Sequence, residues 1–274
     1  MSSSGVSGQV GRHWTPSPLL YASAALHLGA AVATLLRPSA WAWSLSAIAA
    51  NHVLLAGAGL WPRSHLLGPN WTRLPEGNEN AVAVTIDDGP NPDITPRVLD
   101  LLDAHGATAT FFCVGERVIK YADLAQEIVR RGHAIENHSQ HHRHNFSLLG
   151  PKAMNAEIAQ AQDSISRVCG ITPRFFRAPA GLRNPFLEPV LTHLNLRLAS
   201  WTRRGFDTVN GSADSVYERL SDSLAGCDIL LLHDGHCART NNGTPVIFEV
   251  LPRLLEAIRA EGLKPITLRA AKAA

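Results

Sequence analysis

The sequence has little cysteine and no concentration of positive charge. Its four cysteines show neither a CxxC spacing nor the framework of a small disulfide-linked scaffold, which favours reduced thiols and a cytoplasmic domain. The formal net charge is +2, and the basic residues are not gathered in blocks. We therefore predict no nucleic-acid partner, because such a partner is bound by neutralising many phosphates.

Acidic residues and lysine are absent from the first 75 residues. The only charged side chains there are four arginines, Arg12, Arg37, Arg63 and Arg73, whereas all 23 acidic residues follow later. No internal repeat is visible. The composition predicts two parts, residues 1–75 and residues 76–274.

Two long uncharged runs occupy the first part. Residues 19–36 and 40–60 are each about long enough to cross a membrane as a helix, and only "RPS" separates them, which predicts an antiparallel hairpin of two transmembrane helices. Tryptophans lie near the ends of these runs, as in an interfacial aromatic belt: Trp14, Trp41, Trp43, Trp61 and Trp71.

Two other interpretations of these runs stay open. A signal peptide has one short apolar region before its cleavage site, but here a second run follows at once. An alanine-rich helical pair packed on a soluble domain is the other. His27, Asn51 and His52 lie within the spans, where polar side chains usually pair across helices.

The arginines predict the orientation of the hairpin. Arg12, Arg63 and Arg73 flank it, against Arg37 alone in its turn, so the positive-inside rule places both termini in the cytoplasm and the second part on the cytoplasmic side of the inner membrane. Residues 63–78, "RSHLLGPNWTRLPEGN", are typical of a linker.

The second part alternates apolar runs with amphipathic segments. Runs such as "AVAVTI" (81–86), "ATATFF" (107–112) and "DILLL" (228–232) are typical of strands, and 95–104 and 151–170 have helical spacing. Repeated βα units predict an α/β fold with a parallel sheet, open or closed into a barrel. Its chemistry is expected just beyond the carboxyl ends of the strands.

Polar segments follow these predicted strands. "TIDDGP" places Asp87 and Asp88 side by side, a repulsive pair unless a cation balances it, although Asp-Gly and Gly-Pro are also ordinary turn residues. "HSQHHRHNF" contains four histidines, which can form a metal site, a pH-sensitive loop or a solvated loop without function. His138 and His142 with one carboxylate form a set that zinc or another first-row metal accepts.

Later strand ends supply further candidates. Arg177 lies in "FFRAPAG", Trp201, Arg204 and Asp207 lie in "SWTRRGFDT", and His233 ends "LLLHDG". We expect all of them at the same mouth. Trp201 can line a groove or pack the barrel, and both interpretations stay open.

Taken in order, these motifs resemble those of the NodB-type polysaccharide deacetylases, carbohydrate esterase family 4. The resemblance covers about residues 80–268: "TIDDGP", "HSQHH", "RAPAG" and "ILLLHD" are similar to four family motifs. It implies a distorted (β/α) barrel, a divalent metal and removal of an acyl group from a sugar nitrogen.

The resemblance also implies roles for individual residues. Asp87 would be the general base held by Arg177, and His233 the general acid oriented by Asp207. The implied metal ligands are Asp88, His138 and His142. The implied substrate contacts are Trp201, Arg204, Pro179 and Leu232. His141 and His144 have no counterpart in the pattern, and solvated rim residues are favoured over substrate contacts. For His236 and Cys237, a loop histidine and an ordinary thiol are favoured over a second metal site.

The family's fourth motif, DxxDW, is only partly present. "RRGFDT" keeps Asp207, but Arg204 replaces the first acid and Thr208 the tryptophan, which leads to the hypothesis of an anionic, phosphate-bearing sugar. We predict hydrolysis of an N-acyl group, N-acetyl in the first instance, from a lipid-linked saccharide, with Zn²⁺ ahead of Co²⁺, Mn²⁺ or Ni²⁺. The alternatives are a deformylase of a lipid-linked amino sugar, a cell-wall polysaccharide deacetylase, and an inactive metal-dependent carbohydrate-binding protein.

Overall fold

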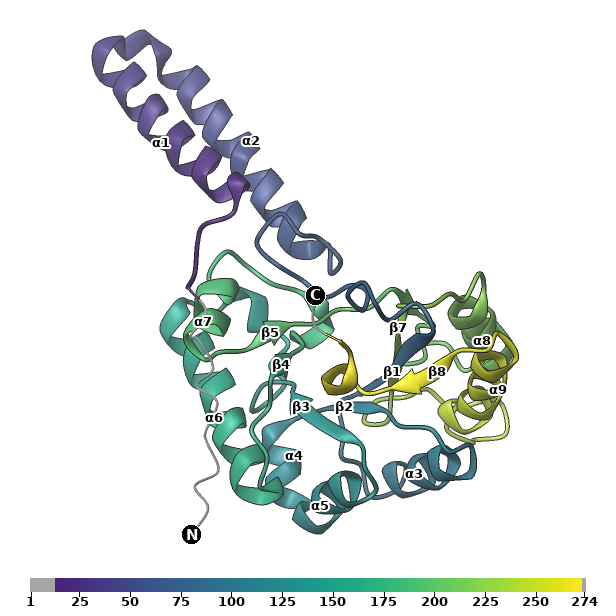
Figure 1. Cartoon of the computed structure of the whole chain (residues 1–274). Helices are drawn as coiled ribbons and strands as arrows, with labels where there is room; N and C mark the ends of the chain where they lie inside the picture. The colour runs from purple at the N-terminus through teal and green to yellow at the C-terminus, as the bar shows by residue number, and fades with distance from the viewer. Residues whose placement is uncertain (1–12, 273–274) are drawn as a thin grey trace.

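A helical hairpin projects from an α/β domain in the computed structural model, which describes residues 13–272 (Figure 1). Helix α1 (Pro18–Leu36) begins at Ser17, whose side chain accepts a hydrogen bond from the Leu20 N–H, and the short turn η1 (Pro38–Ala40) leads into α2 (Trp41–Leu60). Arg12, one of the four arginines behind the predicted orientation, lies outside the described residues.

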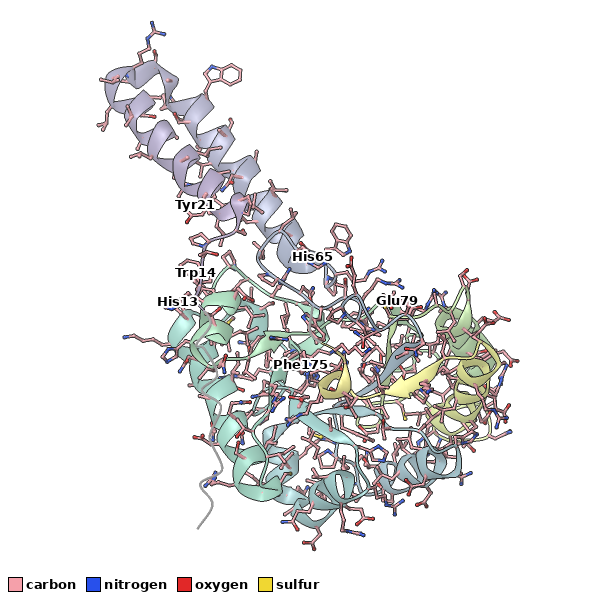
Figure 2. All side chains as sticks on the ribbon, in the orientation of Figure 1. His13, Trp14, Tyr21, His65, Glu79 and Phe175 are labelled. Carbon is pink, nitrogen blue, oxygen red and sulfur yellow. The ribbon has the colours of Figure 1, made fainter. Side chains whose placement is uncertain are left out.

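The hairpin exposes its apolar side chains. Only 11% and 17% of the most apolar windows of its two helices are buried, whereas a core helix of a soluble protein would be mostly buried. Figure 2 shows side chains directed outward along the whole hairpin. Both helices are long and apolar enough to cross a membrane, which weakly supports the predicted anchor.

The domain is built on eight strands whose pairings are all parallel. Their order is β5-β4-β3-β2-β1-β7-β6, and β8 pairs with β1 at its amino-terminal end. The strands are β1 (Ala81–Asp87), β2 (Thr110–Cys113), β3 (Ala134–Asn137), β4 (Phe175–Phe176), β5 (Arg197–Leu198), β6 (Arg203–Arg204), β7 (Ile229–His233) and β8 (Lys264–Ile266).

Helices surround this sheet on its outer side (Figure 1). They are α3 (Thr95–Ala104), α4 (Gly115–Lys120), α5 (Ala122–Arg130), α6 (Pro151–Cys169), α7 (Leu187–His193), α8 (Ala213–Ser221) and α9 (Ile247–Ala260). Three short 3₁₀ turns complete the domain, namely η2 (Phe146–Leu148), η3 (Pro179–Gly181) and η4 (Leu268–Ala270). Gly170 ends α6 in the left-handed conformation that glycine adopts readily.

One extended segment joins the two edges of the curled sheet. Residues 197–198 pair with β4 at one edge, and residues 203–204 pair with β7 at the other edge. Because only four residues separate β5 from β6, the edges are drawn together, and the sheet becomes an irregular, incompletely paired barrel. The predicted distorted (β/α) barrel is confirmed, although α4 and the two-residue β6 were not among the predicted elements.

Apolar residues fill both sides of the sheet. Alternate residues of β1, including Val82, Val84 and Ile86, pack outward against the helices, whereas Ala81 and Ala83 face an inner cluster. Leu74 belongs to this inner cluster and Trp71 packs against it. The division of the chain at residue 75 stays a prediction, and the end of the linker is part of the barrel interior.

Candidate active site

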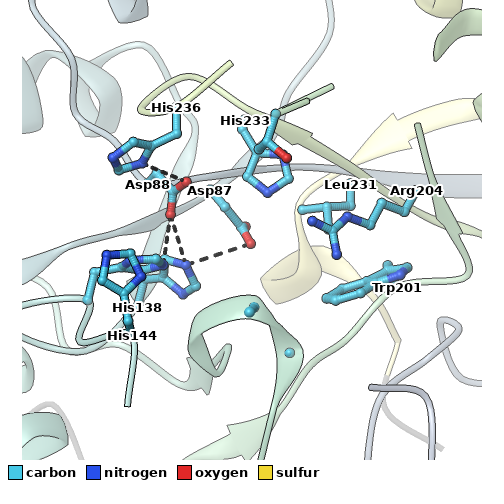
Figure 3. Close-up of a pocket in the computed structure, with 13 residues that line it drawn as sticks. Asp87, Asp88, His138, His144, Trp201, Arg204, Leu231, His233 and His236 are labelled. Atoms are coloured by element: carbon cyan, nitrogen blue, oxygen red, sulfur yellow. Dashed lines mark hydrogen bonds and ion pairs between the residues drawn. The ribbon is translucent and has the colours of Figure 1, made fainter. Parts of the chain in front are cut away.

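Polar side chains gather in a hollow at the carboxyl ends of the strands (Figure 3). Parallel pairing of β1 with β7 places Asp87 beside His233, although 146 positions separate them in the chain. The other predicted residues that line the hollow are Asp88, His138, His142, Trp201 and Arg204. The sheet therefore brings motifs from five separate segments into one pocket.

Asp88, His138 and His142 form the only group of at least three potential metal ligands found among residues 13–272, with ligand atoms all within 4.8 Å of one another. Asp88 Oδ1 lies 3.2 Å from His138 Nε2 and 3.1 Å from His142 Nε2. This oxygen is buried, and no hydrogen-bond partner satisfies it within the described residues. Three such donor atoms around one point fit a divalent cation.

The backbone holds these ligands in unusual conformations. Asp88 has a φ of 75° and His142 a φ of 46°, in the left-handed region that residues other than glycine rarely adopt. Such conformations cluster at functional sites because the surrounding structure must impose them. Gly235 allows the close approach, since a Cβ there would lie 2.4 Å from the Asp88 Cβ.

Hydrogen bonds fix the orientation of the ligand side chains. His138 Nδ1 donates to the Arg177 carbonyl oxygen at 2.8 Å, which leaves Nε2 directed at Asp88. His236 Nδ1 lies 3.1 Å from the second carboxylate oxygen of Asp88. This contact of His236 is the main feature of the site that the sequence motifs did not predict. The spacing of His236 after His233 gave no indication that it would lie beside Asp88.

The charges around the three ligands favour a cation. Burial alone would raise the pKa of Asp88, but contact with His138 and the hydrogen bond from His236 hold the pKa well below its usual range. Burial and the neighbouring His138 lower the pKa of His142 to about 4, so its ring is neutral at pH 7. An ionised carboxylate beside a neutral imidazole is the state in which both bind a metal.

Asp87 lies beside this group and is held by Arg177. Arg177 Nη1 donates to Asp87 Oδ1 at 2.6 Å and to the Thr85 hydroxyl at 2.8 Å. The guanidinium is almost fully buried and lies 4.1 Å from the Phe112 ring centroid. The other Asp87 oxygen, Oδ2, is 3.9 Å from His138 Nε2, so it faces the ligand group.

His233 is oriented by Asp207. The two oxygens of the buried Asp207 carboxylate accept from the His233 ring Nδ1 at 2.8 Å and from the His233 backbone N–H at 2.7 Å. Burial opposes the positive charge, but Asp207 outweighs it and raises the pKa of His233 to about 9. The ring is therefore protonated at neutral pH, with Nε2 as the nitrogen not bound to Asp207.

Two of the predicted substrate contacts lie elsewhere. Leu232 packs in the outer core, and Leu231 lines the pocket in its place, because successive side chains of a strand point to opposite faces. Ala180 and Gly181 line the pocket, and Pro179 is buried beside them. Trp201 both lines the pocket and packs in the inner cluster, so both interpretations of this residue apply.

The remaining histidines of the cluster differ in position. His144 lines the rim of the pocket, whereas the His141 ring bonds to Glu157 at 2.9 Å and is not among the lining residues. Cys237 is partly buried and belongs to no potential metal-ligand group in the described chain.

Comparison with known proteins assigns the family. A family model described as polysaccharide deacetylase matches residues 75–199. A peptidoglycan-N-acetylglucosamine deacetylase of Bacillus cereus is 30% identical over 193 residues, covering 70% of this chain and 87% of the relative. The chain belongs to the polysaccharide deacetylase family. The family predicted from the motifs is thereby confirmed.

Two further relatives agree with this assignment. A chitooligosaccharide deacetylase of Azorhizobium caulinodans is 32% identical over 159 residues, covering 58% of this chain and 75% of the relative. The structure of a family 4 carbohydrate esterase from Streptomyces lividans in complex with acetate superposes with a TM-score of 0.63 at 28% identity, covering 72% of this chain and 98% of that one. The match to the family model begins at residue 75, after the hairpin.

Proposed function

We propose that this protein is a metal-dependent hydrolase that removes an N-acyl group, in the first instance N-acetyl, from a sugar. The observation that carries the proposal is the arrangement in one pocket of three metal-ligand side chains, a carboxylate held by Arg177 and a histidine held by Asp207. Relatives named as deacetylases of N-acetylated saccharides support it.

Asp88, His138 and His142 would hold the divalent metal, and we propose Zn²⁺, with Co²⁺, Mn²⁺ and Ni²⁺ as alternatives. When bound there, the metal supplies a Lewis acid that polarises an amide carbonyl and lowers the pKa of water. Three protein ligands leave coordination positions open, which is typical of catalytic rather than structural sites.

Asp87 is placed to act as the general base. Arg177 holds its Oδ1, so Oδ2 remains to accept a proton from a water molecule that attacks the amide carbon. The neighbouring carboxylate of Asp88 belongs to the ligand group. The two adjacent aspartates therefore divide the functions of proton acceptor and metal ligand.

His233 is placed to act as the general acid. As the bond between the acyl carbon and the sugar nitrogen breaks, the protonated ring donates a proton to the departing nitrogen. The water proton ends on Asp87, and the products are a carboxylic acid and an amino sugar. Asp207 stabilises the charged ring before the transfer and keeps its orientation.

An inactive carbohydrate-binding protein is the contrasting function. Binding alone requires neither a base facing the metal ligands nor an acid with a raised pKa, and this chain has both. We therefore favour the enzyme. A deformylase would use the same residues, and the acyl group released distinguishes the two.

We also propose that the hairpin anchors the enzyme in the inner membrane, with the domain on the cytoplasmic side. Two exposed apolar helices and the arginine distribution support this arrangement. It favours a lipid-linked saccharide as the substrate. Deacetylation of a cell-wall polymer is the alternative, and it needs the opposite topology.

The test is to measure acyl release by the purified full-length protein in detergent. Chelator treatment followed by Zn²⁺, Co²⁺, Mn²⁺ or Ni²⁺ identifies the active metal form, and chromatography of the product distinguishes acetate from formate. We expect acetate from N-acetylated saccharides and none from the chelated protein. No acyl release from polymeric or lipid-linked N-acyl sugars with any of these metals would refute the proposed function.

A further inference from the structure

A second hollow lies beside the active-site pocket and shares Trp201 and Arg204 with it. We call it the arginine groove, and its relevant residues are Arg63, Arg204, Arg219, Trp61, Trp201 and Phe206. Figure 3 shows Arg204 and Trp201, the two residues that both hollows share, on the side of the pocket away from His138.

The charge of the groove is not neutralised by the protein. Within residues 13–272, no ion pair joins Arg63, Arg204 or Arg219 to a carboxylate. Arg203, which also lines the groove, differs because its Nε bonds to the buried Asp228 at 2.7 Å. Asp222 is the one acidic lining residue, so the groove is basic.

Arg204 carries the most specific sign of a missing ligand. Its Nε is buried and has no hydrogen-bond partner in the described part of the chain. Its guanidinium carbon lies 5.4 Å from the Trp201 ring centroid and 5.0 Å from that of Phe206. Buried donors are normally satisfied, and a guanidinium held on aromatic rings is suited to bidentate binding of an oxyanion.

Phe206 joins two of the arginines. The guanidinium carbon of Arg219 lies 5.6 Å from the Phe206 ring centroid, and that of Arg204 also contacts this ring. Phe206 has a φ of 61° and is 45% exposed, so a bulky residue adopts a disfavoured conformation that does not bury it. Strain of this kind points to a binding function.

The other wall of the groove follows the hairpin directly. Trp61 and Arg63 come just after the last residue of α2, Leu60. Arg63 Nη1 donates to the Thr202 carbonyl at 3.1 Å, and the Ser200 hydroxyl donates to the Pro62 carbonyl at 2.7 Å. The groove therefore lies between the catalytic pocket and the end of the apolar hairpin.

We infer that the arginine groove binds the phosphate that joins the substrate's sugar to a membrane lipid. The substrate class is then a glycosyl phosphate or diphosphate ester of a lipid alcohol. Its N-acyl sugar occupies the active-site pocket, its phosphate contacts Arg204, Arg63 and Arg219, and its lipid continues toward α2. This inference rests on the proposed function, since it assigns the reacting sugar to that pocket.

The test measures binding separately from turnover. Full-length protein with the Asp87→Asn substitution is titrated with three ligands that carry the same sugar: a neutral N-acetylchitooligosaccharide, uridine diphosphate N-acetylglucosamine, and N-acetylglucosaminyl diphosphate esterified to a long-chain polyprenol. We expect the polyprenyl ester to bind at least about tenfold more tightly than the neutral sugar, a factor that one charge-assisted contact provides.

Substitutions in the groove test the assignment. Arg204→Gln and Arg219→Gln, each added to that protein, are expected to lower the ratio of phosphate-bearing to neutral affinity by about tenfold. Arg97→Gln is the matched control, because Arg97 also lies over a phenylalanine, Phe248, but outside the groove. It should leave the ratio unchanged.

Each other outcome decides something. Equal binding of all three ligands overturns phosphate binding by the arginine groove and leaves the proposed function intact. Equal binding of the nucleotide sugar and the polyprenyl ester overturns the lipid assignment. If the groove substitutions weaken association only with vesicles of anionic phospholipid, the arginines contact the membrane surface and the inference is wrong. If the protein prefers the polyprenyl ester but the unsubstituted protein releases no acyl group, the proposed function is refuted and the assignment of phosphate binding to the arginine groove stands.

Discussion

The hairpin and the barrel domain place polar and apolar groups in opposite ways. In the hairpin, Leu35 and Trp43 are each 81% exposed, whereas Asn51 is buried and donates to the Ser23 hydroxyl at 2.8 Å. In the domain, aliphatic side chains are buried on both faces of the sheet, and polar groups lie at the strand ends.

This difference is the one expected if the proposed anchor lies in hydrocarbon and the domain in water. Water favours burial of apolar surface, whereas hydrocarbon gives no such preference and leaves polar groups to find partners within the protein. The His27 and His52 rings, whose Nε2 atoms are 3.4 Å apart, and the Thr34–Ser44 hydrogen bond of 2.9 Å follow this rule. The exposed apolar surface of the hairpin therefore suits a lipid environment, whereas the buried apolar core of the domain is typical of a protein surrounded by water.

The most disruptive change in the domain is loss of a predicted metal ligand. We expect His142→Ala to lose both the metal and measurable turnover, because the two ligand side chains that remain are too few to hold the ion. Metal content by elemental analysis and acyl release measure the two effects. His141→Ala is the matched control, since that ring bonds to Glu157 instead, and equal behaviour of the two variants would contradict the ligand assignment.

Asp87→Asn should separate chemistry from metal binding. We expect the metal to remain and the rate to fall by about 10² to 10⁴, the range typical of a lost general base. Single-turnover kinetics and metal content are measured on the same sample. If Asp87→Asn loses the metal, Asp87 is a ligand and the roles of the two adjacent aspartates must be exchanged.

A charge on the exposed face of the hairpin tests the contrast between the two regions directly. Val53 in α2 is 74% exposed, and Val209 in the domain is 82% exposed. Val53→Asp is expected to oppose membrane insertion by about 2.5 to 3.5 kcal/mol, and Val209→Asp to have little effect. The membrane-bound fraction after alkaline extraction is the measurement. If both variants remain in the membrane fraction to the same extent, the exposed face of the hairpin does not contact lipid.

The smallest expected effect concerns the pH dependence. A general acid works while protonated, so activity is lost as the pH rises through the pKa of His233, which Asp207 raises to about 9. Asp207→Asn lowers this pKa and should move the alkaline limb of the pH–rate profile to lower pH. Asp214→Asn, at an exposed position of α8, should leave the limb in place. An unchanged limb in Asp207→Asn would exclude His233 as the acid.

Much of the site follows from local patterns because a parallel sheet gathers its carboxyl ends at one edge. Asp87, His138 and His233 could be placed there from strand patterns and motifs alone. Leu231 was also within reach, since alternation along β7 separates it from Leu232. The two-residue strand β6 could not be predicted, because "RR" has no periodicity and its pairing depends on the closure of the barrel.

The sequence by itself predicted two uncharged apolar runs ahead of a βα domain, the positions of most strands and the residues of the family motifs. These features depend on the order of neighbouring residues, which sets periodicity and local conformation. Only the tertiary structure decided that His236 contacts Asp88, and that Arg204, Arg219 and the segment after α2 share one groove. Such contacts join segments far apart in the chain, and their distances are set by how the barrel closes and packs.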